Sequence, residues 1–428
     1  MKKLYIFIIC IVLTLITGCG NENDKEGKNN TTNEIPKNAT EIDVATRDNF
    51  SNGVAWVKAK NGNYYLIDAT GKALFGLDTH KGDRIYDVEH YSNEYGIVSY
   101  HNEELNTDYK KIFDKKGKMV YAEWDGTRAR HEILAGPDDK GYILVDNLGK
   151  VESINLITGK SVTNSAKWTS ETRKMESLGG GIFYNQYVGF FNASSGSRMP
   201  LEALDIYNYD SYGDFVSVKT TSFNWTRFIN GKAIFSSSIY NYIVTNEGEV
   251  TEIEKLEGYK LAISTNTIIG DESSYNGQTV YGEKTLTKDK GYFDLEGNKV
   301  LDLSKYDIYY TSPMYNDKLA IILKAEELNE RVFTVLDKNG KELFKPIKSN
   351  SYYELDDDTI YGDNQILNYK GETLIDISKY DWALGFDYGG EGTITVCPKS
   401  IDLESNRFYL NSKGQEIKPY YENELKLK

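Results

Sequence analysis

The decapeptide VLDKNGKELF, residues 335–344, is one copy of a phrase that recurs along the chain. IFDKKGKMVY (112–121), YFDLEGNKVL (292–301) and YLIDATGKAL (65–74) share its pattern: apolar residues, an Asp, two further residues, Gly, a polar residue and another apolar residue. A strand that ends at Asp, followed by Gly at a position with φ > 0, is typical of a three- to five-residue hairpin loop with a glycine bulge. The sequence therefore predicts a series of β-hairpins.

A longer repeat encloses the phrase. GNKVLDLSKYDIYY (297–310) matches GETLIDISKYDWAL (371–384) at a spacing of 74 residues, and each such unit holds two phrases. Modules of roughly 40 residues with about four short strands are typical of propeller blades. In 299–338 we predict such a set of strands as KVLDL, IYYTS, KLAIILK and RVFTVLD. We predict a structural turn role, with a poorer copy at Gly196, for Gly71, Gly117, Gly149, Gly248, Gly297, Gly340, Gly371 and Gly414.

The predicted fold class is all-β, a β-propeller of about seven to nine four-stranded blades. An open β-solenoid and two separate β domains are the alternatives. The phrase is weakest between 180 and 290, so a domain boundary is expected there if one exists. We expect the first and last segments to complete one mixed sheet, because ring closure removes exposed sheet edges.

The stretch FSNGVAWVKAKNGNYYLIDATGKALF (50–75) resembles the WG repeat of bacterial proteins. The likeness lies in the apolar positions and in the Gly-Lys turn, whereas Tyr64-Tyr65 stands where that family has its Trp-Gly pair. Degenerate copies extend over most of 50–428. The resemblance implies a propeller-like β-repeat fold and no particular reaction, since the family has no shared catalytic residues.

The first residues predict an export signal. Lys2 and Lys3 precede a mostly apolar run from Leu4 to Ile16, whose length of about 20 Å as a helix is short of the roughly 30 Å needed to span a bilayer. Ile16-Thr17-Gly18-Cys19 resembles a bacterial lipobox, which implies a lipidated Cys19. We therefore predict a lipoprotein signal peptide at 1–18, the lipidated cysteine with a disordered polar tether at 19–43, and the β-repeat domain at 44–428.

Charge and cysteine content exclude several classes of protein. The formal net charge is −14, which argues against nucleic acid and against attraction to anionic lipid. The cysteines are Cys10, Cys19 and Cys397, so only Cys397 is expected to remain a free thiol and no intrachain disulfide is expected. We expect a monomer.

No catalytic residue, metal site or cofactor site is predicted. Two acidic groups could in principle hold a cation, but a solvated loop is the preferred interpretation of each: His80, Asp83, Asp87 and His90, and the run Asp356, Asp357 and Asp358. SLGGGIFY (177–184) lacks nucleotide-binding spacing and is interpreted as a glycine-rich turn at a bulge. Cys397 is expected to be a buried apolar residue.

The remaining signal is aromatic. Five tryptophans fall in different modules, and packing between blades is preferred over ligand stacking for Trp56, Trp124, Trp168, Trp225 and Trp382. The expected role is that of a lipoprotein on the extracytoplasmic face of the cell membrane, which acts as a binding or scaffolding module for a protein, peptide or glycan. The alternative is a hydrolase or lyase that acts on polysaccharide with carboxylates from several blades.

Overall fold

The computed structural model describes residues 35–428 except 52, 80–81, 90–93, 125–130, 164–174, 213, 220–222, 264–274, 285–286, 325–330, 350–352, 356–358, 363–364, 379, 387–392, 399–406 and 412. Across this part of the chain nearly all regular structure is β, with 3₁₀ turns at Glu202–Leu204 and Glu254–Leu256. No helix in it is long and apolar enough to cross a membrane.

Nine antiparallel four-stranded sheets, blades 1 to 9 in chain order, account for most of the strands. Blades 1 to 3 are β2 (Val44–Arg47), β3 (Val54–Ala59), β4 (Tyr64–Asp68), β5 (Ala73–Leu77); β6 (Arg84–Val88), β7 (Tyr95–Asn102), β8 (Thr107–Asp114), β9 (Met119–Ala122); and β10 (His131–Ala135), β11 (Tyr142–Asn147), β12 (Lys150–Asn155), β13 (Ser161–Thr163). Blades 4 to 6 are β14 (Glu176–Gly179), β15 (Ile182–Asn185), β16 (Gly189–Asn192), β17 (Ser197–Arg198); β20 (Asn224–Trp225), β21 (Lys232–Ser236), β22 (Asn241–Thr245), β23 (Val250–Glu252); and β24 (Lys260–Leu261), β25 (Thr279–Lys284), β26 (Asp289–Asp294), β27 (Lys299–Asp302). Blades 7 to 9 are β28 (Ile308–Thr311), β29 (Lys318–Lys324), β30 (Arg331–Asp337), β31 (Ile347–Ser349); β32 (Tyr353–Leu355), β33 (Thr359–Gly362), β34 (Gln365–Asn368), β35 (Thr373–Asp376); and β36 (Tyr380–Phe386), β37 (Ile394–Pro398), β38 (Phe408–Leu410), β39 (Glu416–Ile417).

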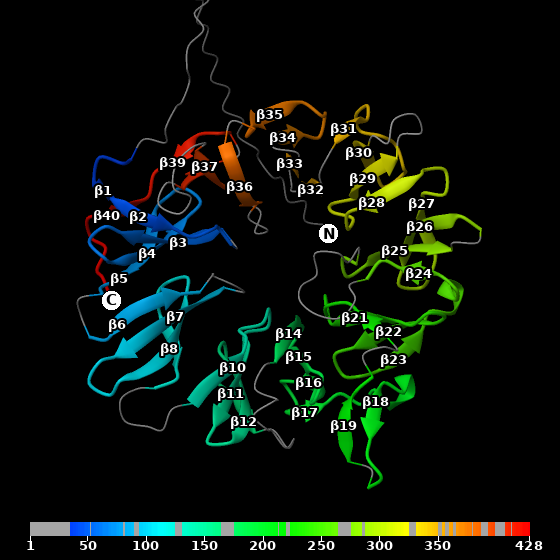
Figure 1. Ribbon diagram of the computed structural model, residues 1–428, viewed down its shortest axis with the longest axis horizontal. Helices are drawn as coiled ribbons and strands as arrows, with labels where there is room; N and C mark the ends of the chain where they lie inside the picture. The colour runs from blue at the N-terminus through cyan, green and yellow to red at the C-terminus, as the bar shows by residue number, and fades with distance from the viewer. Residues whose placement is uncertain are drawn as a thin grey trace, which may run out of the picture. The chain divides into compact units, whose positions relative to one another are not determined.

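The blades form a closed ring. In the described residues, nine clusters of buried apolar side chains each join one blade to the next. The last of them packs Val57 and Ile67 of blade 1 against Tyr409 and Ile417 of blade 9, and Figure 1 shows the blue strands of blade 1 beside the orange-to-red strands of blade 9. The predicted propeller is confirmed, with nine blades, and the open solenoid and the two-domain alternative are wrong.

Each sheet buries both of its faces. On β3, Val54 and Trp56 belong to the cluster shared with blade 2, while Ala55 and Val57 belong to the cluster shared with blade 9. Successive side chains of a strand point to opposite faces, so an apolar run can serve two neighbours at once. This geometry explains why the strands are apolar in runs rather than alternating with polar residues.

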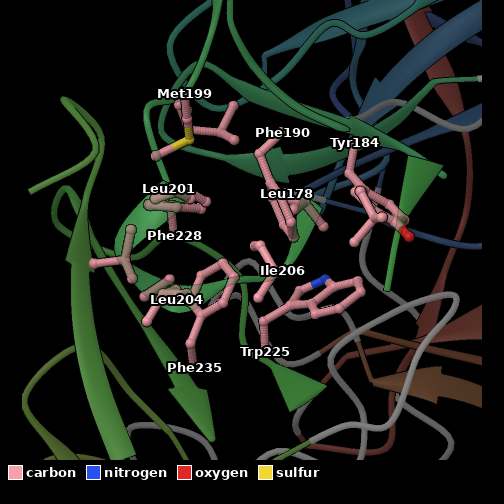
Figure 2. Packing of buried hydrophobic residues seen from close by; sticks show 14 of the residues in the cluster. Leu178, Tyr184, Phe190, Met199, Leu201, Leu204, Ile206, Trp225, Phe228 and Phe235 are labelled. Atoms are coloured by element: carbon pink, nitrogen blue, oxygen red, sulfur yellow. The ribbon is translucent and has the colours of Figure 1, made fainter. Parts of the chain in front are cut away.

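The largest break in the repeat lies between blades 4 and 5. Here the chain adds a two-stranded sheet of β18 (Tyr207–Tyr209) and β19 (Phe215–Val218). Tyr207 of β18 and Val218 of β19 belong to the cluster that joins blades 4 and 5, part of which Figure 2 shows. In this cluster the Trp225 ring lies 4.9 Å from the Tyr184 ring and 5.0 Å from the Phe190 ring, measured between centroids. The weak phrase between 180 and 290 therefore marks an insertion within the ring rather than a domain boundary.

The ring closes differently from the prediction. Blade 1 consists only of N-terminal strands and blade 9 only of C-terminal strands, and the mixed sheet is a separate pair, β1 (Ala39–Glu41) with β40 (Tyr420–Glu422). The C-terminal tail then follows the free edge of β5, with parallel bridges from Lys72 to Tyr420 and from Gly76 to Leu427. Paired structure thus begins a few residues before residue 44, the boundary expected from the sequence.

The recurring phrase forms the turn that its residues predict. Asp68 ends β4, its Oδ1 accepts hydrogen bonds from the N–H groups of Thr70 and Lys72, and the Gly71 N–H donates to the Asp68 carbonyl oxygen. All eight glycines of the predicted set have a positive φ, from 71° at Gly117 to 88° at Gly71 and Gly248. The turn joins the third and fourth strands of the blade.

One detail of the repeat was placed wrongly. KVLDL (299–303) contains β27, the last strand of blade 6, so the four strands predicted within 299–338 straddle two blades. Gly149 lies in the turn between the second and third strands of blade 3, whereas the third and fourth strands there are joined through Gly159. The error in 299–338 arises because successive hairpins have similar turn residues.

Two turn glycines give a matched test. At Gly71 a Cβ would lie 2.5 Å from the Lys418 carbonyl oxygen, whereas at Gly149 it would meet nothing within 4 Å, although φ is similar at the two positions. We expect Gly149→Ala to lower the free energy of unfolding by about 1–2 kcal/mol from backbone strain alone, and Gly71→Ala to lower it by about 3 kcal/mol or more because a steric clash is added. Urea unfolding followed by tryptophan fluorescence measures the difference, and equal losses would contradict this account.

Candidate functional site

A cleft of about 460 Å³ lies where the first strands of blades 1 and 2 approach each other. Its lining residues come from β2, β3 and β4 on one side and from β6 and the residue after it on the other: Thr46, Arg47, Asp48, Trp56, Lys58 and Tyr64, and Asp87, Val88 and Glu89. This volume falls within the range usual for small-molecule sites. We call it the interblade cleft.

The blade 1 wall is set by strand register. Thr46 pairs with Lys58, and Lys58 pairs with Tyr64, so these residues form one row across β2, β3 and β4. The Lys58 Nζ lies 5.1 Å from the centroid of the Tyr64 ring, a cation–π contact. No hydrogen bond or ion pair joins the Lys58 ammonium to another residue of the described chain.

Arg47 connects this wall to the closing interface of the ring. Its guanidinium carbon lies 6.0 Å from the centroid of the Tyr409 ring, and its buried Nε makes no hydrogen bond with any described residue. Burial lowers the pKa of Arg47, although an arginine keeps its charge at neutral pH. The fully buried Tyr409 donates a hydrogen bond of 2.6 Å to the Asp48 carbonyl oxygen, so blade 9 helps to position Asp48 at the cleft.

The blade 2 wall is acidic. The Glu89 carboxylate pairs with the Lys110 ammonium, while the exposed Asp87 has no hydrogen bond or ion pair within the described residues. In that same part of the chain, no ion pair crosses the cleft from Arg47 or Lys58 to Asp87. The cleft is therefore polarised: blade 1 contributes both of its cations, Arg47 and Lys58, together with the Asp48 carboxylate, whose Oδ1 accepts from the Asn49 N–H. Blade 2 contributes only carboxylates, Asp87 and Glu89.

Aromatic residues line the cleft without offering a stacking surface. Trp56 is 1% exposed and Tyr64 is 7% exposed, because both pack into the cluster between blades 1 and 2. The buried Trp56 Nε1 has no hydrogen-bond partner among the described residues. Packing was the interpretation preferred for the tryptophans, and it is confirmed for Trp56 and Trp225; Trp124 packs partly buried, Trp168 lies outside the described residues, and only the backbone of Trp382 is described.

The histidine and aspartate cluster considered from the sequence is divided in the structure. Asp83 accepts hydrogen bonds from Asn102 Nδ2 at 2.7 Å and from the Tyr109 hydroxyl, whereas Asp87 lines the interblade cleft. His80, His90 and the Asp356–Asp358 run lie outside the described residues, and of Cys397 only the backbone is described. Where the chain is described, no three His, Cys, Asp or Glu side chains gather in a group that could hold a metal ion.

The glycine-rich stretch is a turn, as predicted. Gly179, Gly180 and Gly181 all have positive φ and follow a bulge between β14 and β15. The Gly180 N–H donates to Asp139 Oδ1 and the Gly181 N–H donates to Asp138 Oδ2, each at 2.6 Å. Since carboxylates of blade 3 already occupy these donors, the turn serves the packing of blade 3 against blade 4.

Sequence reasoning missed the cleft itself. Of its charged residues only Asp87 was considered, and then for a metal site. Arg47, Lys58 and Glu89 belong to no motif, and they meet only because blades 1 and 2 are neighbours in the ring. No signal within a single strand identifies them.

These features define the class of protein: a nine-bladed β-propeller with a polarised cleft between its first two blades. No protein-family model and no curated protein matches the sequence, so the resemblance to the WG repeat stays a prediction. Among solved structures, the chain is similar to the eukaryotic initiation factor (11% identity, covering 87% of this chain and 92% of that one, TM-score 0.41). It is also similar to the WD40 domain of SCAP from fission yeast (8%, 88% and 97%, 0.33) and to the C-terminal WD40 domain of Sif2 (9%, 87% and 99%, 0.30).

The Tyr409 hydroxyl gives a test of how the closing interface supports the cleft. Tyr409→Phe keeps the buried ring but leaves the Asp48 carbonyl without its donor, and we expect a loss of about 1 kcal/mol in the free energy of unfolding. Tyr184→Phe is the matched control, because no hydrogen bond holds that buried hydroxyl within the described chain. Urea unfolding compares the two variants, and an equal or larger loss in Tyr184→Phe would refute the role of the bond.

Proposed function

We propose that this chain is a lipid-anchored binding module on the extracytoplasmic face of a bacterial cell membrane, whose propeller binds a ligand in the interblade cleft. The observation that carries the binding role is the cleft itself, with charged groups on both walls that do not neutralise each other. A ring packed through nine apolar interfaces holds those groups in a fixed geometry, which lowers the entropic cost of binding.

The anchor is supported by the N-terminal sequence. Lys2 and Lys3, the apolar run and the small residues before Cys19 together fit a lipoprotein signal, and a diacyl chain pair suffices for stable attachment. The partner would be a protein, peptide or glycan of the envelope, and the negative net charge of −14 disfavours nucleic acid. The recurring turn phrase supports an origin from WG-like repeats, and this resemblance implies no particular reaction.

The binding role is tested by filling the cleft. Thr46 lies exposed on the blade 1 wall, so Thr46→Tyr would occupy the space without changing a charge. Peptides, glycans and small polar compounds are first screened by thermal shift, and we expect some of them to raise the Tm of the native protein. At a hundredfold excess over its Kd, such a ligand adds about 2.7 kcal/mol to the free energy of unfolding. These ligands should raise the Tm much less in Thr46→Tyr. Thr251→Tyr, at an exposed position on β23, is the control, and ligands that shift all three proteins alike would refute the cleft as the site.

The anchor is tested by metabolic labelling with an alkyne fatty acid in the expressing bacterium. We expect the native chain to be labelled and to sediment with membranes, and Cys19→Ala to lose the label. Cys10→Ala is the matched control. Cys10 lies within the predicted signal peptide, so its substitution should leave labelling unchanged. Label retained in Cys19→Ala, or absent from the native chain, would overturn the proposal.

A further inference from the structure

We propose that the interblade cleft recognises a zwitterion, a compact ligand with a carboxylate at one end and an ammonium group at the other, such as a free amino acid or a short peptide with both termini free. This inference rests on the proposed binding role of the cleft and names the chemical class of its ligand. The carboxylate would lie against Lys58, and the ammonium group against Asp87.

Lys58 and Asp87, on opposite walls of the cleft, each lack an ion-pair partner among the described residues. The Lys58 ammonium lies over the face of the Tyr64 ring, and within the described chain it has no carboxylate partner. Asp87 lines the opposite wall without a cationic partner in that same part of the chain, while the neighbouring Glu89 is already paired with Lys110. A ligand that carries both charges satisfies both walls at once, whereas a ligand with one charge leaves the other wall unpaired.

Blade 1 also contains two buried side-chain N–H groups that can donate hydrogen bonds. Arg47 Nε and Trp56 Nε1 are both buried and both lack a hydrogen-bond partner among the described residues. Each can only donate, so a group that satisfies either of them must accept hydrogen bonds, as a carboxylate does. Both residues line the cleft from blade 1, but Arg47 pairs with Val57 and packs on Tyr409 of blade 9, so only Trp56 lies on the same face of the sheet as Lys58. On the blade 1 wall, Lys58 therefore supplies the positive charge and Trp56 a donor, beside the Asp48 carboxylate, whose Oδ1 accepts a hydrogen bond from the Asn49 N–H.

Stacking of a ligand on the aromatic residues of the cleft is not the main source of affinity. A sugar ring binds on the open face of an aromatic side chain, but Trp56 is covered by its neighbours and Tyr64 is buried with Lys58 over its ring. Recognition in this cleft must therefore come from charge and hydrogen bonds. The volume of about 460 Å³ admits an amino acid or a short peptide and is small for a folded domain.

The test is isothermal titration of the full-length chain, held in mild detergent, with a graded panel. Glycine, β-alanine, γ-aminobutyrate, 5-aminovalerate, diglycine and triglycine vary the distance between the two charges and separate free amino acids from peptides. N-acetylated and C-amidated forms of the best binder each remove one charge, and trehalose carries none. We expect at least one zwitterion to bind, and removal of either charge to weaken it about tenfold to hundredfold.

Substitutions on each wall test which wall binds which end of the ligand. Lys58→Gln should weaken the zwitterion but have no further effect on the C-amidated ligand, and Asp87→Asn should weaken it but have no further effect on the N-acetylated ligand. Lys345→Gln and Asp307→Asn, at exposed positions outside the cleft, are the controls and should bind like the native chain. Urea unfolding checks that each variant keeps its fold.

The outcomes separate the two proposals. If a ligand with one charge or none binds as tightly as every zwitterion, and Thr46→Tyr abolishes that binding, the cleft is a site but the ligand class is wrong. If zwitterions bind and both wall variants behave like the controls, the assigned recognition is wrong. If no compound in the panel binds in a manner sensitive to Thr46→Tyr, the zwitterion inference falls, and the binding role is then decided by the wider thermal-shift search.

Discussion

Burial of both faces of every sheet is the constraint on which this fold depends. A sheet with two apolar faces needs a neighbour on each side, and an open row of such sheets leaves one face bare at each end. The contact between blades 9 and 1 covers both bare faces, and seven of its buried residues are larger than alanine. At roughly 1.5–3 kcal/mol per large buried side chain, this one interface contributes on the order of 10 kcal/mol, which is comparable with the net stability of a typical protein of about 5–15 kcal/mol. The ring therefore has to close to be stable.

What could be predicted from the sequence was local. The turn phrase encodes a hairpin through the aspartate that caps it and the glycine that adopts positive φ, and neither effect depends on the rest of the chain. Hence the all-β class, the repeat and the approximate number of blades were predicted. Assigning hairpins to blades was harder, because the turn at Gly149 looks like the turn at Gly159 and only the pairing of whole strands tells them apart. The closing pair β1–β40 joins residues almost 400 positions apart and leaves no local signal.

The interblade cleft could not be predicted for the same reason. Its walls belong to different blades, and its side chains occupy strand positions where other blades have different residues. Trp56 was noticed as an aromatic residue and Asp87 as an acid, yet the position of Asp87 opposite Trp56 and Lys58 appears only when β3 and β6 are placed together. Positions that repeat along the chain build the scaffold, whereas the cleft consists of positions that do not repeat. Functional residues on a repeat scaffold are therefore expected at positions whose residue type differs from one blade to the next.

Arg47 contacts the interface that closes the ring and also lines the interblade cleft. Its guanidinium lies over Tyr409 of blade 9, on the face of blade 1 where Val57 also packs against that blade. The Tyr409 hydroxyl donates to the Asp48 carbonyl oxygen, and both Arg47 and Asp48 also line the cleft. Blade 1 is thus held from both sides, and the contacts that position Arg47 and the Asp48 backbone exist only while the ring is closed. A ligand that binds the blade 1 wall favours the closed ring by mass action, in proportion to its affinity for that state alone. The interface that stabilises the fold is thereby also the one that organises the site, because the residues after β2 serve both.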